Sequence, residues 1–184
     1  MESLAQRFNL HPLNVEDCLS KRQLPKMDDH TNHIFVLFHF PIQAKSRSGI
    51  GSGQVSFFVG SNFLISVHDT NMSTVTKLFD ACQQDPKHQS AFMKSSARLL
   101  YQILDALVDD LFPFLQNIEE SLGEISDRVF GAKKSVAAQL SFQRRTIVDL
   151  RRMVSPMRRL ATDLALKSQR FSNKKIFPST SAMS

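Results

Sequence analysis

The sequence predicts an α/β protein in which a small mixed β-sheet, flanked by short helices, is followed by a long antiparallel helical hairpin. Two observations carry this prediction. Aromatic and β-branched stretches are confined to residues 33–68, whereas apolar residues at steps of three and four continue from about residue 95 to residue 168. We therefore divide the 184 residues into an α/β domain (1–93), a helical hairpin (94–170) and a truncated or disordered tail (171–184).

The first 93 residues contain the elements expected of the sheet and its helices. Short helices are expected at residues 2–8 and after Pro12, because proline suits the first position of a helix. Strands are expected at 33–40, where Pro41 ends the run, and at 54–60 and 62–68, with a polar loop over 44–53 and a tight Gly60-Ser61 turn between the last two strands. A further helix should run from about Ser73 to Gln84, where Pro86 interrupts it.

Two long amphipathic helices are expected in the second half of the chain. The first carries one apolar stripe: Leu100, Leu104, Leu107, Leu111, Leu115, Ile118, Leu122, Ile125 and Val129. The second, from Val136 onwards, keeps the same period. Pro113 and Pro156 should each bend their helix locally, and Gly131 suits the turn between the two helices. Helices of this length exceed the width of a small domain, so one end of the hairpin should project as an arm.

The charges divide between these two helices. Residues 94–131 hold 3 basic and 7 acidic side chains, residues 132–184 hold 12 basic and 2 acidic ones, and the first 93 residues hold 8 of each, which together give the net charge of +6. Arginine pairs recur every seven residues, at 144–145, 151–152 and 158–159. This spacing predicts a solvated flank that faces the acidic partner helix rather than a nucleic-acid surface.

Several other functions are disfavoured by the sequence. Its glycines do not form a phosphate-binding loop, and no nucleophile, base and orienting group can be proposed together, so we do not expect an enzyme. Cys18 and Cys82 lack metal-ligand spacing and are expected to be buried thiols. His30 and His33 form an H-x-x-H pair without a third ligand, which we interpret as part of a surface turn. No apolar run is long enough to span a bilayer.

Carboxylates are the remaining candidates for chemistry, because hard divalent cations prefer oxygen ligands. Glu16 and Asp17 lie on a short predicted helix, and Asp105, Asp109 and Asp110 lie on a long one. Asp105 and Asp109 are one turn apart, so they share a helix face and repel each other mildly. A bound cation would relieve that repulsion, and a solvated acidic flank remains the alternative interpretation.

Five segments, in this order, resemble the cytoplasmic domain of CorA-type magnesium and cobalt transporters. They are LHPLNVEDCL (10–19), RQLPKMDDH (22–30), QVSFFVGSNFLISVHD (54–69), LLYQILDALVDDLFPFLQNIEESL (99–122) and QRRTIVDLRRMVSPMRRL (143–160). Leu24 departs from the pattern, since the family often has arginine there. The resemblance implies an α/β domain with paired helices, on the cytoplasmic face of the inner (plasma) membrane in the full-length protein.

The same resemblance implies a homopentamer in which divalent cations bind between neighbouring subunits and hold the pore shut. By resemblance, Glu16, Asp17 and Asp105 are the regulatory metal ligands, and Mg²⁺ (or Co²⁺) is both regulator and cargo. The expected partners are further copies of the chain and divalent cations, without nucleic acid, and the membrane is reached only through C-terminal helices that this sequence lacks. The chain stops before the family's stalk and membrane helices, so we expect a soluble fragment that cannot transport and that binds Mg²⁺ weakly or not at all. A stand-alone helical-hairpin scaffold and the zinc-transporting branch of the family stay open as alternatives.

Overall fold

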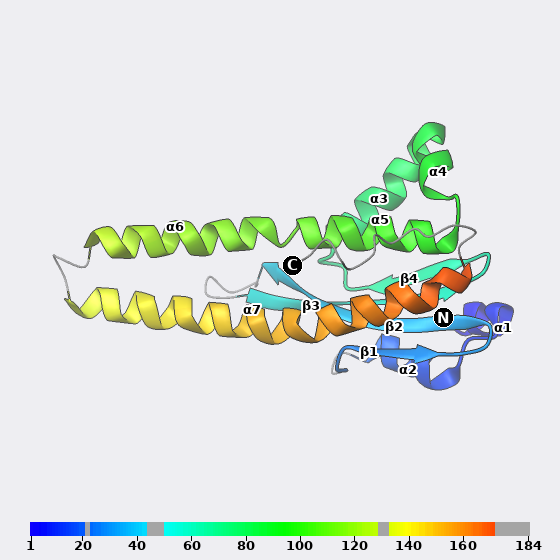
Figure 1. The fold of residues 1–184 in the computed structure, drawn as a ribbon, viewed down its shortest axis with the longest axis horizontal. Helices are drawn as coiled ribbons and strands as arrows, with labels where there is room; N and C mark the ends of the chain where they lie inside the picture. The colour runs from blue at the N-terminus through cyan, green and yellow to red at the C-terminus, as the bar shows by residue number, and fades with distance from the viewer. Residues whose placement is uncertain (21–22, 44–49, 129–132, 172–184) are drawn as a thin grey trace.

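The computed structural model describes residues 1–20, 23–43, 50–128 and 133–171. Their elements, in chain order, are α1 (Glu2–Phe8), α2 (Pro12–Leu19), β1 (Lys26–Asp29), β2 (His33–Gln43), β3 (Ile50–Gly60), β4 (Leu64–His68), α3 (Ser73–Gln84), α4 (Pro86–Phe92), α5 (Ser96–Asp109), α6 (Phe112–Arg128), α7 (Lys133–Lys167) and the short 3-10 helix η1 (Ser168–Phe171). This order and arrangement confirm the predicted fold class, a sheet flanked by short helices and followed by a long helical hairpin (Figure 1).

The sheet has the strand order β1-β2-β3-β4, and all three pairings are antiparallel. The prediction of a mixed sheet was wrong in this respect. Parallel neighbours need a crossover of a dozen or more residues, whereas β1 and β2 are only three residues apart, as are β3 and β4. The chain therefore turns back at each of these steps and produces a simple meander.

Sequence patterns located the central strands but misplaced their ends. β2 continues through Pro41, which pairs with Ser52, because β1 covers the other edge of β2 only from Ile34 to Leu37 and leaves that edge free at the proline. β3 begins at Ile50, inside the predicted loop, while residues 44–49 of that loop lie outside the described part of the chain. β1 was not predicted, since its sequence KMDD has no apolar alternation.

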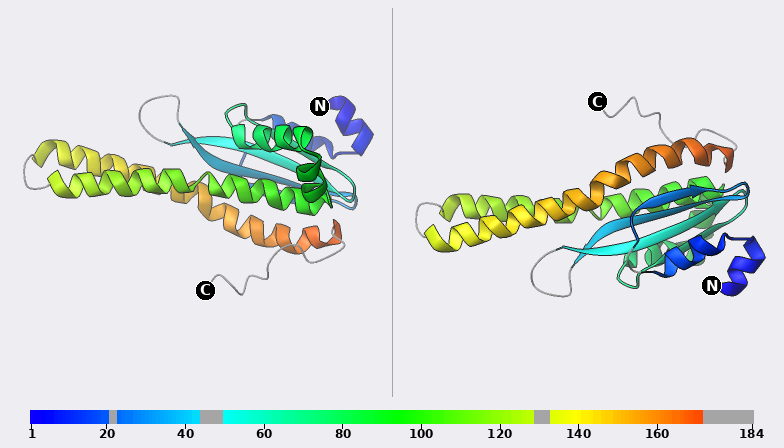
Figure 2. Two further views of the ribbon diagram at one scale, coloured as in Figure 1. Left: turned by 90° about the horizontal axis from the view of Figure 1, so that it is seen from above. Right: turned by 90° about the horizontal axis from the view of Figure 1, so that it is seen from below.

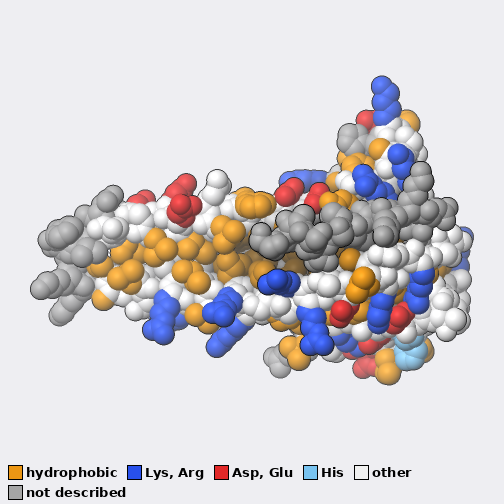
Figure 3. Space-filling model, in the orientation of Figure 1, with side chains coloured by type: hydrophobic (Ala, Val, Ile, Leu, Met, Phe, Trp, Pro, Cys, Tyr) orange, Lys and Arg blue, Asp and Glu red, His pale blue; other side chains and the backbone are white. Residues whose placement is uncertain are grey.

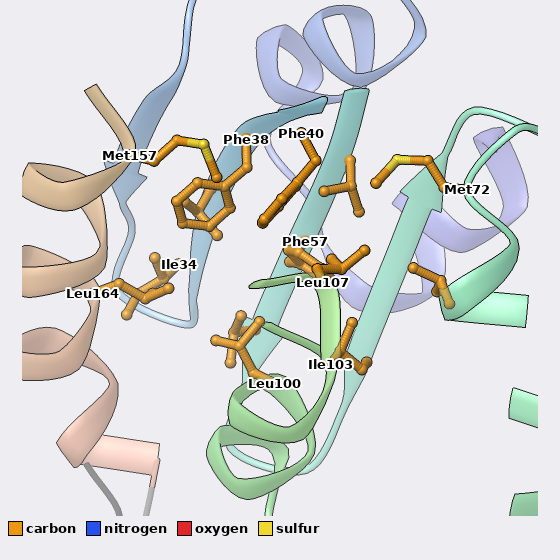
Figure 4. Packing of buried hydrophobic residues seen from close by; sticks show 14 residues of the cluster. Ile34, Phe38, Phe40, Phe57, Met72, Leu100, Ile103, Leu107, Met157 and Leu164 are labelled. Atoms are coloured by element: carbon orange, nitrogen blue, oxygen red, sulfur yellow. The ribbon is translucent and has the colours of Figure 1, made fainter. Parts of the chain in front are cut away.

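Two hydrophobic clusters cover the two faces of the sheet. α1 and α2 pack on one face, against Phe35, Leu37 and Phe58. The larger cluster occupies the other face, where residues of α5 and of the C-terminal half of α7 pack on alternate residues of the same strands (Figure 4): Ile34, Val36, Phe38, Phe40, Val55, Phe57 and Val59. Figure 2 shows the sheet lying between the N-terminal helices and α7. The base of the hairpin is thus part of the core of the sheet.

The predicted first long helix is divided in two. α5 ends at Asp109 and α6 begins at Phe112, with Leu111 N–H donating to the Val108 carbonyl oxygen (2.9 Å) in a tighter turn between them. Pro113 explains the break, because it has no N–H for the carbonyl of Asp109 and its ring crowds that carbonyl. Pro156, in contrast, lies inside the continuous helix α7, which bends on its way from the arm to the sheet (Figure 2).

α6 and the first half of α7 run antiparallel and project beyond the sheet as an arm (Figure 1). This confirms the predicted hairpin and its projecting end. The turn expected near Gly131 and the tail after Phe171 lie outside the described residues. Within the described ranges, no helix is both long enough and apolar enough to cross a bilayer.

Candidate functional site

α2 presents the acidic pair Glu16 and Asp17 at the edge of the sheet. Pro12 opens this helix, and Asn14 and Cys18, one turn apart, are its buried residues. Glu16 is exposed on the other side of the helix, and the Asp17 side chain is 16% exposed. The spacing of the two buried residues shows which side of α2 faces the sheet. On this helix, the Glu16 carboxylate is therefore in solvent and the Asp17 carboxylate lies near β1.

Asp17 is neutralised by a lysine that the sequence did not single out. Lys26 Nζ lies 2.5 Å from Asp17 Oδ2 and 3.0 Å from Asp28 Oδ2, so one ammonium bridges α2 and β1. Burial acts to lower the pKa of Lys26, but hydrogen bonds to Asp17 and Asp28 outweigh it and raise the pKa. Burial likewise acts to raise the pKa of Asp28, and the hydrogen bonds from Lys26 and Asn14 reverse this and lower it.

A chain of polar contacts continues from Asp28 towards the histidines. Asn14 Nδ2 donates to Asp28 Oδ2 (2.5 Å), so Asn14 Oδ1 accepts from His30 Nε2 (2.6 Å). The ring of His30 stacks between those of His11 and His33, with centroids 4.9 and 4.7 Å away. His33 is 1% exposed, which contradicts its assignment to a surface turn. β2 begins at this residue and carries its side chain under the turn, where the ring packs on Phe58.

The same turn is tied to the end of α7 and to η1. Arg170 Nη2 lies 2.6 Å from Asp29 Oδ1 and donates to the His30 carbonyl oxygen at 2.8 Å, while Lys167 Nζ lies 3.4 Å from Asp29 Oδ2. These contacts connect residues more than 130 positions apart in the sequence. The strand that holds Lys26 is therefore held at its other end by the last residue of α7 and by η1.

Asp105 lies on α5, over the opposite face of the sheet from α2. Its side chain is exposed, as are those of Asp109 and Asp110. The Thr74 hydroxyl donates to Asp110 Oδ2 and so joins the start of α3 to the end of α5. The three predicted ligands are therefore not brought together within one chain: Glu16 and Asp17 lie on one side of the sheet and Asp105 on the other.

The donor chemistry suits Mg²⁺ even though one chain does not complete a site. Glu16 and Asp105 offer exposed carboxylate oxygens, which are the ligands that a hard cation accepts. Among the described residues, no cluster of three or more His, Cys, Asp or Glu side chains is placed to hold a metal ion. A cation bound at either side therefore needs water, or a second molecule, for its remaining ligands.

The charged rows of the two arm helices do not face each other. Figure 3 shows acidic side chains along the outer edge of α6 and basic ones along the outer edge of α7, with hydrophobic side chains between the two rows. The arginine pairs of α7 are exposed as predicted, but the apolar stripes rather than the charges meet between the helices. Part of this apolar surface is uncovered, since Phe112 is 59% and Leu115 48% exposed.

The surroundings of Cys18 disfavour its thiolate form. Burial first, and then the charge of Asp17, raises the pKa of the Cys18 thiol to about 11. Its Sγ donates to the Val15 carbonyl oxygen (3.1 Å) within α2. Cys18 and Cys82 are both free and buried, as predicted from the sequence.

The structure thus combines an antiparallel sheet, covered by helices on both faces, with carboxylates exposed on either side of it. The family model described as "CorA-like Mg2+ transporter protein" matches residues 1–177. The chain belongs to this family.

Curated relatives and solved structures agree with this assignment. The chain is 29% identical over 157 residues to the "Putative metal ion transporter YfjQ" of Bacillus subtilis, and 26% identical over 167 residues to the "Cobalt/magnesium transport protein CorA" of Thermotoga maritima. These alignments cover 83% and 89% of the chain but 46% of each relative, so the chain spans a little under half of their length. Both relatives are named as transporters and not as enzymes.

The fold matches that of the soluble domain of CorA from Methanocaldococcus jannaschii. The TM-score is 0.75 at 17% identity, and the match covers 98% of this chain and 68% of that one. The complete CorA magnesium transporter from the same organism matches with a TM-score of 0.72 at 16% identity, over 98% of this chain and 54% of that one. At such identities the likeness shows the fold.

Proposed function

We propose that the chain is the cytoplasmic, cation-sensing part of a Mg²⁺/Co²⁺ transporter, and that divalent cations bound between its subunits favour the closed pore. One observation carries this proposal: Glu16 and Asp17 lie on one side of the sheet, and the exposed Asp105 lies on the other. In a ring of identical subunits, one side of each copy meets the opposite side of the next copy. Such an assembly, a pentamer by resemblance, would bring the two half-sites together.

The mechanism follows from the charges. Facing carboxylates repel each other when no cation is present, which favours subunits that are further apart. A divalent cation with its water ligands reverses the sign of that interaction and binds the closed arrangement better than the open one, so rising cytosolic Mg²⁺ shifts the population to the closed state. Mg²⁺ acts here as a regulator, and it is also the proposed cargo.

Influx measured against internal Mg²⁺ in the full-length transporter tests this proposal. Asp17→Asn and Asp105→Asn keep the side-chain shape but remove one charge from the proposed site, so inhibition should need more internal Mg²⁺, while ion selectivity should not change. Glu120→Gln is a matched control, because Glu120 is exposed on the arm, on the acidic helix α6. The proposal would be wrong if the inhibition curves of Asp17→Asn and Asp105→Asn superimposed on those of the wild type and the control. These carboxylates would then be ordinary solvated side chains without a regulatory role.

A further inference from the structure

Lys26 places a cation between two carboxylates, Asp17 on α2 and Asp28 on β1. Its ammonium lies 2.5 Å from Asp17 Oδ2 and 3.0 Å from Asp28 Oδ2, and its side chain is 34% exposed. A bridging cation between carboxylates from two elements is the arrangement expected of a divalent ion, and here the protein supplies that cation itself. Because the ammonium is part of the protein chain, its effective concentration at Asp17 is higher than that of a cation in solution.

Several contacts hold Lys26 in this position. β1 pairs with β2 through the register Lys26–Leu37, which places the start of the side chain over the sheet. The ammonium lies 5.6 Å from the centroid of the Phe35 ring, whose face attracts cations. Asn14 holds the second carboxylate, Asp28, from the buried side of α2. The lysine is thus positioned by strand pairing, an aromatic face and two acids.

Among the described residues, two other cations near β1 pair with a different carboxylate. Lys167 and Arg170 are both engaged by Asp29, at the far end of β1. Among the described residues, Lys26 is the only cationic side chain in an ion pair with Asp17. Glu16, the neighbour of Asp17, is exposed and adds negative charge on the same helix.

We propose that Lys26 is a built-in competitor for the divalent cation at Asp17, and that it raises the cation concentration at which the sensor fills. This inference rests on the proposed function. A divalent ion that approaches Asp17 must displace the ammonium or bind beside it against like-charge repulsion, so part of its binding free energy is lost. Lys26 would thereby set the sensing threshold, without contacting the transported ion.

The size of the effect follows from the charges and their exposure. An ammonium and a divalent ion that share Asp17 would lie close enough to repel each other even in a water-like medium, and salt and exposure weaken this repulsion. Removing the ammonium should therefore tighten Mg²⁺ binding by about three- to tenfold. A larger gain is not expected, because a partly exposed pair is well screened.

The experiment is Mg²⁺ titration of the purified full-length transporter, followed by calorimetry and by the shift in its unfolding temperature. Lys26→Met should lower the half-saturating Mg²⁺ concentration by about three- to tenfold, whereas Lys26→Arg should stay near the wild type because it keeps the cation. Lys167→Met is the matched control, because it removes an equal charge from a lysine that pairs with Asp29 instead of Asp17. Its half-saturation should not change.

A double substitution separates competition from a general change in fold. In an Asp17→Asn background, Lys26→Met should give no tightening, because the carboxylate for which the two cations compete has gone. If Lys26→Met alone does not fold, Lys26→Met with Asp28→Asn relieves the repulsion between the two acids and is compared with Asp28→Asn alone. The competitor proposal predicts tighter Mg²⁺ binding in that comparison too.

The outcomes distinguish this inference from the proposed function. Unchanged half-saturation in Lys26→Met, together with weaker binding in Asp17→Asn and Asp105→Asn, would overturn the role of Lys26 and leave the carboxylate sensor standing. Unchanged binding in all of these variants would overturn the proposed function as well. Equal tightening in Lys26→Met and Lys167→Met would show a bulk charge effect and would also overturn the competitor role.

Discussion

Replacing Leu164 tests whether the end of α7 is anchored in the core of the sheet. Leu164 is fully buried and packs in the larger cluster beside Ile34 (Figure 4). Leu164→Ala deletes three carbons, which corresponds to about 2.4 kcal/mol at about 0.8 kcal/mol per buried methylene, before the cavity is counted. Since measured Leu→Ala losses in cores span roughly 2.7–5.0 kcal/mol, we expect a loss of about 3 kcal/mol in the free energy of unfolding.

Urea denaturation followed by circular dichroism measures this loss directly, and a thermal scan should show a decrease of about 6–12 °C. Leu166→Ala is the matched control, because Leu166 lies on the same helix, only two positions later, and is 65% exposed. It should change the free energy of unfolding by no more than about 0.5 kcal/mol. Equal losses in the two variants, or a loss below about 1 kcal/mol for Leu164→Ala, would refute the packing of α7 on the sheet.

Three further predictions concern single residues. Gly123→Ala should stabilise α6 by about 0.5–1 kcal/mol in urea denaturation, because an added Cβ at this helical position meets nothing within 4 Å; a loss of stability would contradict that. Burial, together with the charges of His30, His11 and Arg170, lowers the pKa of His33 in the folded protein to about 4. The pKa of a histidine in the unfolded chain is about 6.5. Between about pH 6.5 and about pH 4 the unfolded chain therefore binds a proton at His33 that the folded protein does not. Stability should therefore fall as the pH drops from about 6.5 to about 4, and His33→Gln should flatten that dependence; an unchanged slope would exclude His33 as its source. Burial raises the pKa of the Cys18 thiol to about 11. In a Cys82→Ser protein at pH 8, iodoacetamide should therefore alkylate folded Cys18 at least about a hundredfold more slowly than Cys18 in the denatured chain. Comparable rates in the folded and denatured protein would contradict the burial of Cys18.

Apolar spacing predicted the long helices because the same residues that repeat along the sequence are those that pack. Leu100 and Leu107, on the predicted stripe, are buried against the sheet. Leu115 and Leu122 continue the stripe but are 48% and 37% exposed, because α6 has by then left the sheet. The spacing of apolar residues in the sequence shows which side of a helix is apolar. Only the tertiary structure shows how far along the helix that side is covered by the sheet.

The sequence predicted that the candidate ligands lie on helix surfaces, but it could not predict how the fold arranges them. The placement of Glu16 and Asp105 on helix surfaces follows from local spacing, whereas their separation by the sheet depends on which face each helix covers. Lys26 was not singled out from the sequence, because β1 lacks a strand pattern and the lysine meets Asp17 only after β1 pairs with β2. The run K-M-D-D was the available signal, as a basic residue close to two acids.

The two halves of α7 lie in different surroundings, so they should differ in their stability against local unfolding. Its second half shares the core of the sheet through Met157 and Leu164, while its first half, whose buried residues among those described are Val136 and Thr146, packs along α6 in the arm. Backbone amides after Pro156 should exchange with solvent only when the whole sheet unfolds, and those before it whenever the arm opens locally. The boundary between two cooperative units thus falls inside a continuous helix. The arm can therefore unfold and refold locally while the sheet, with Lys26 on β1 and Asp17 on the adjacent α2, stays folded.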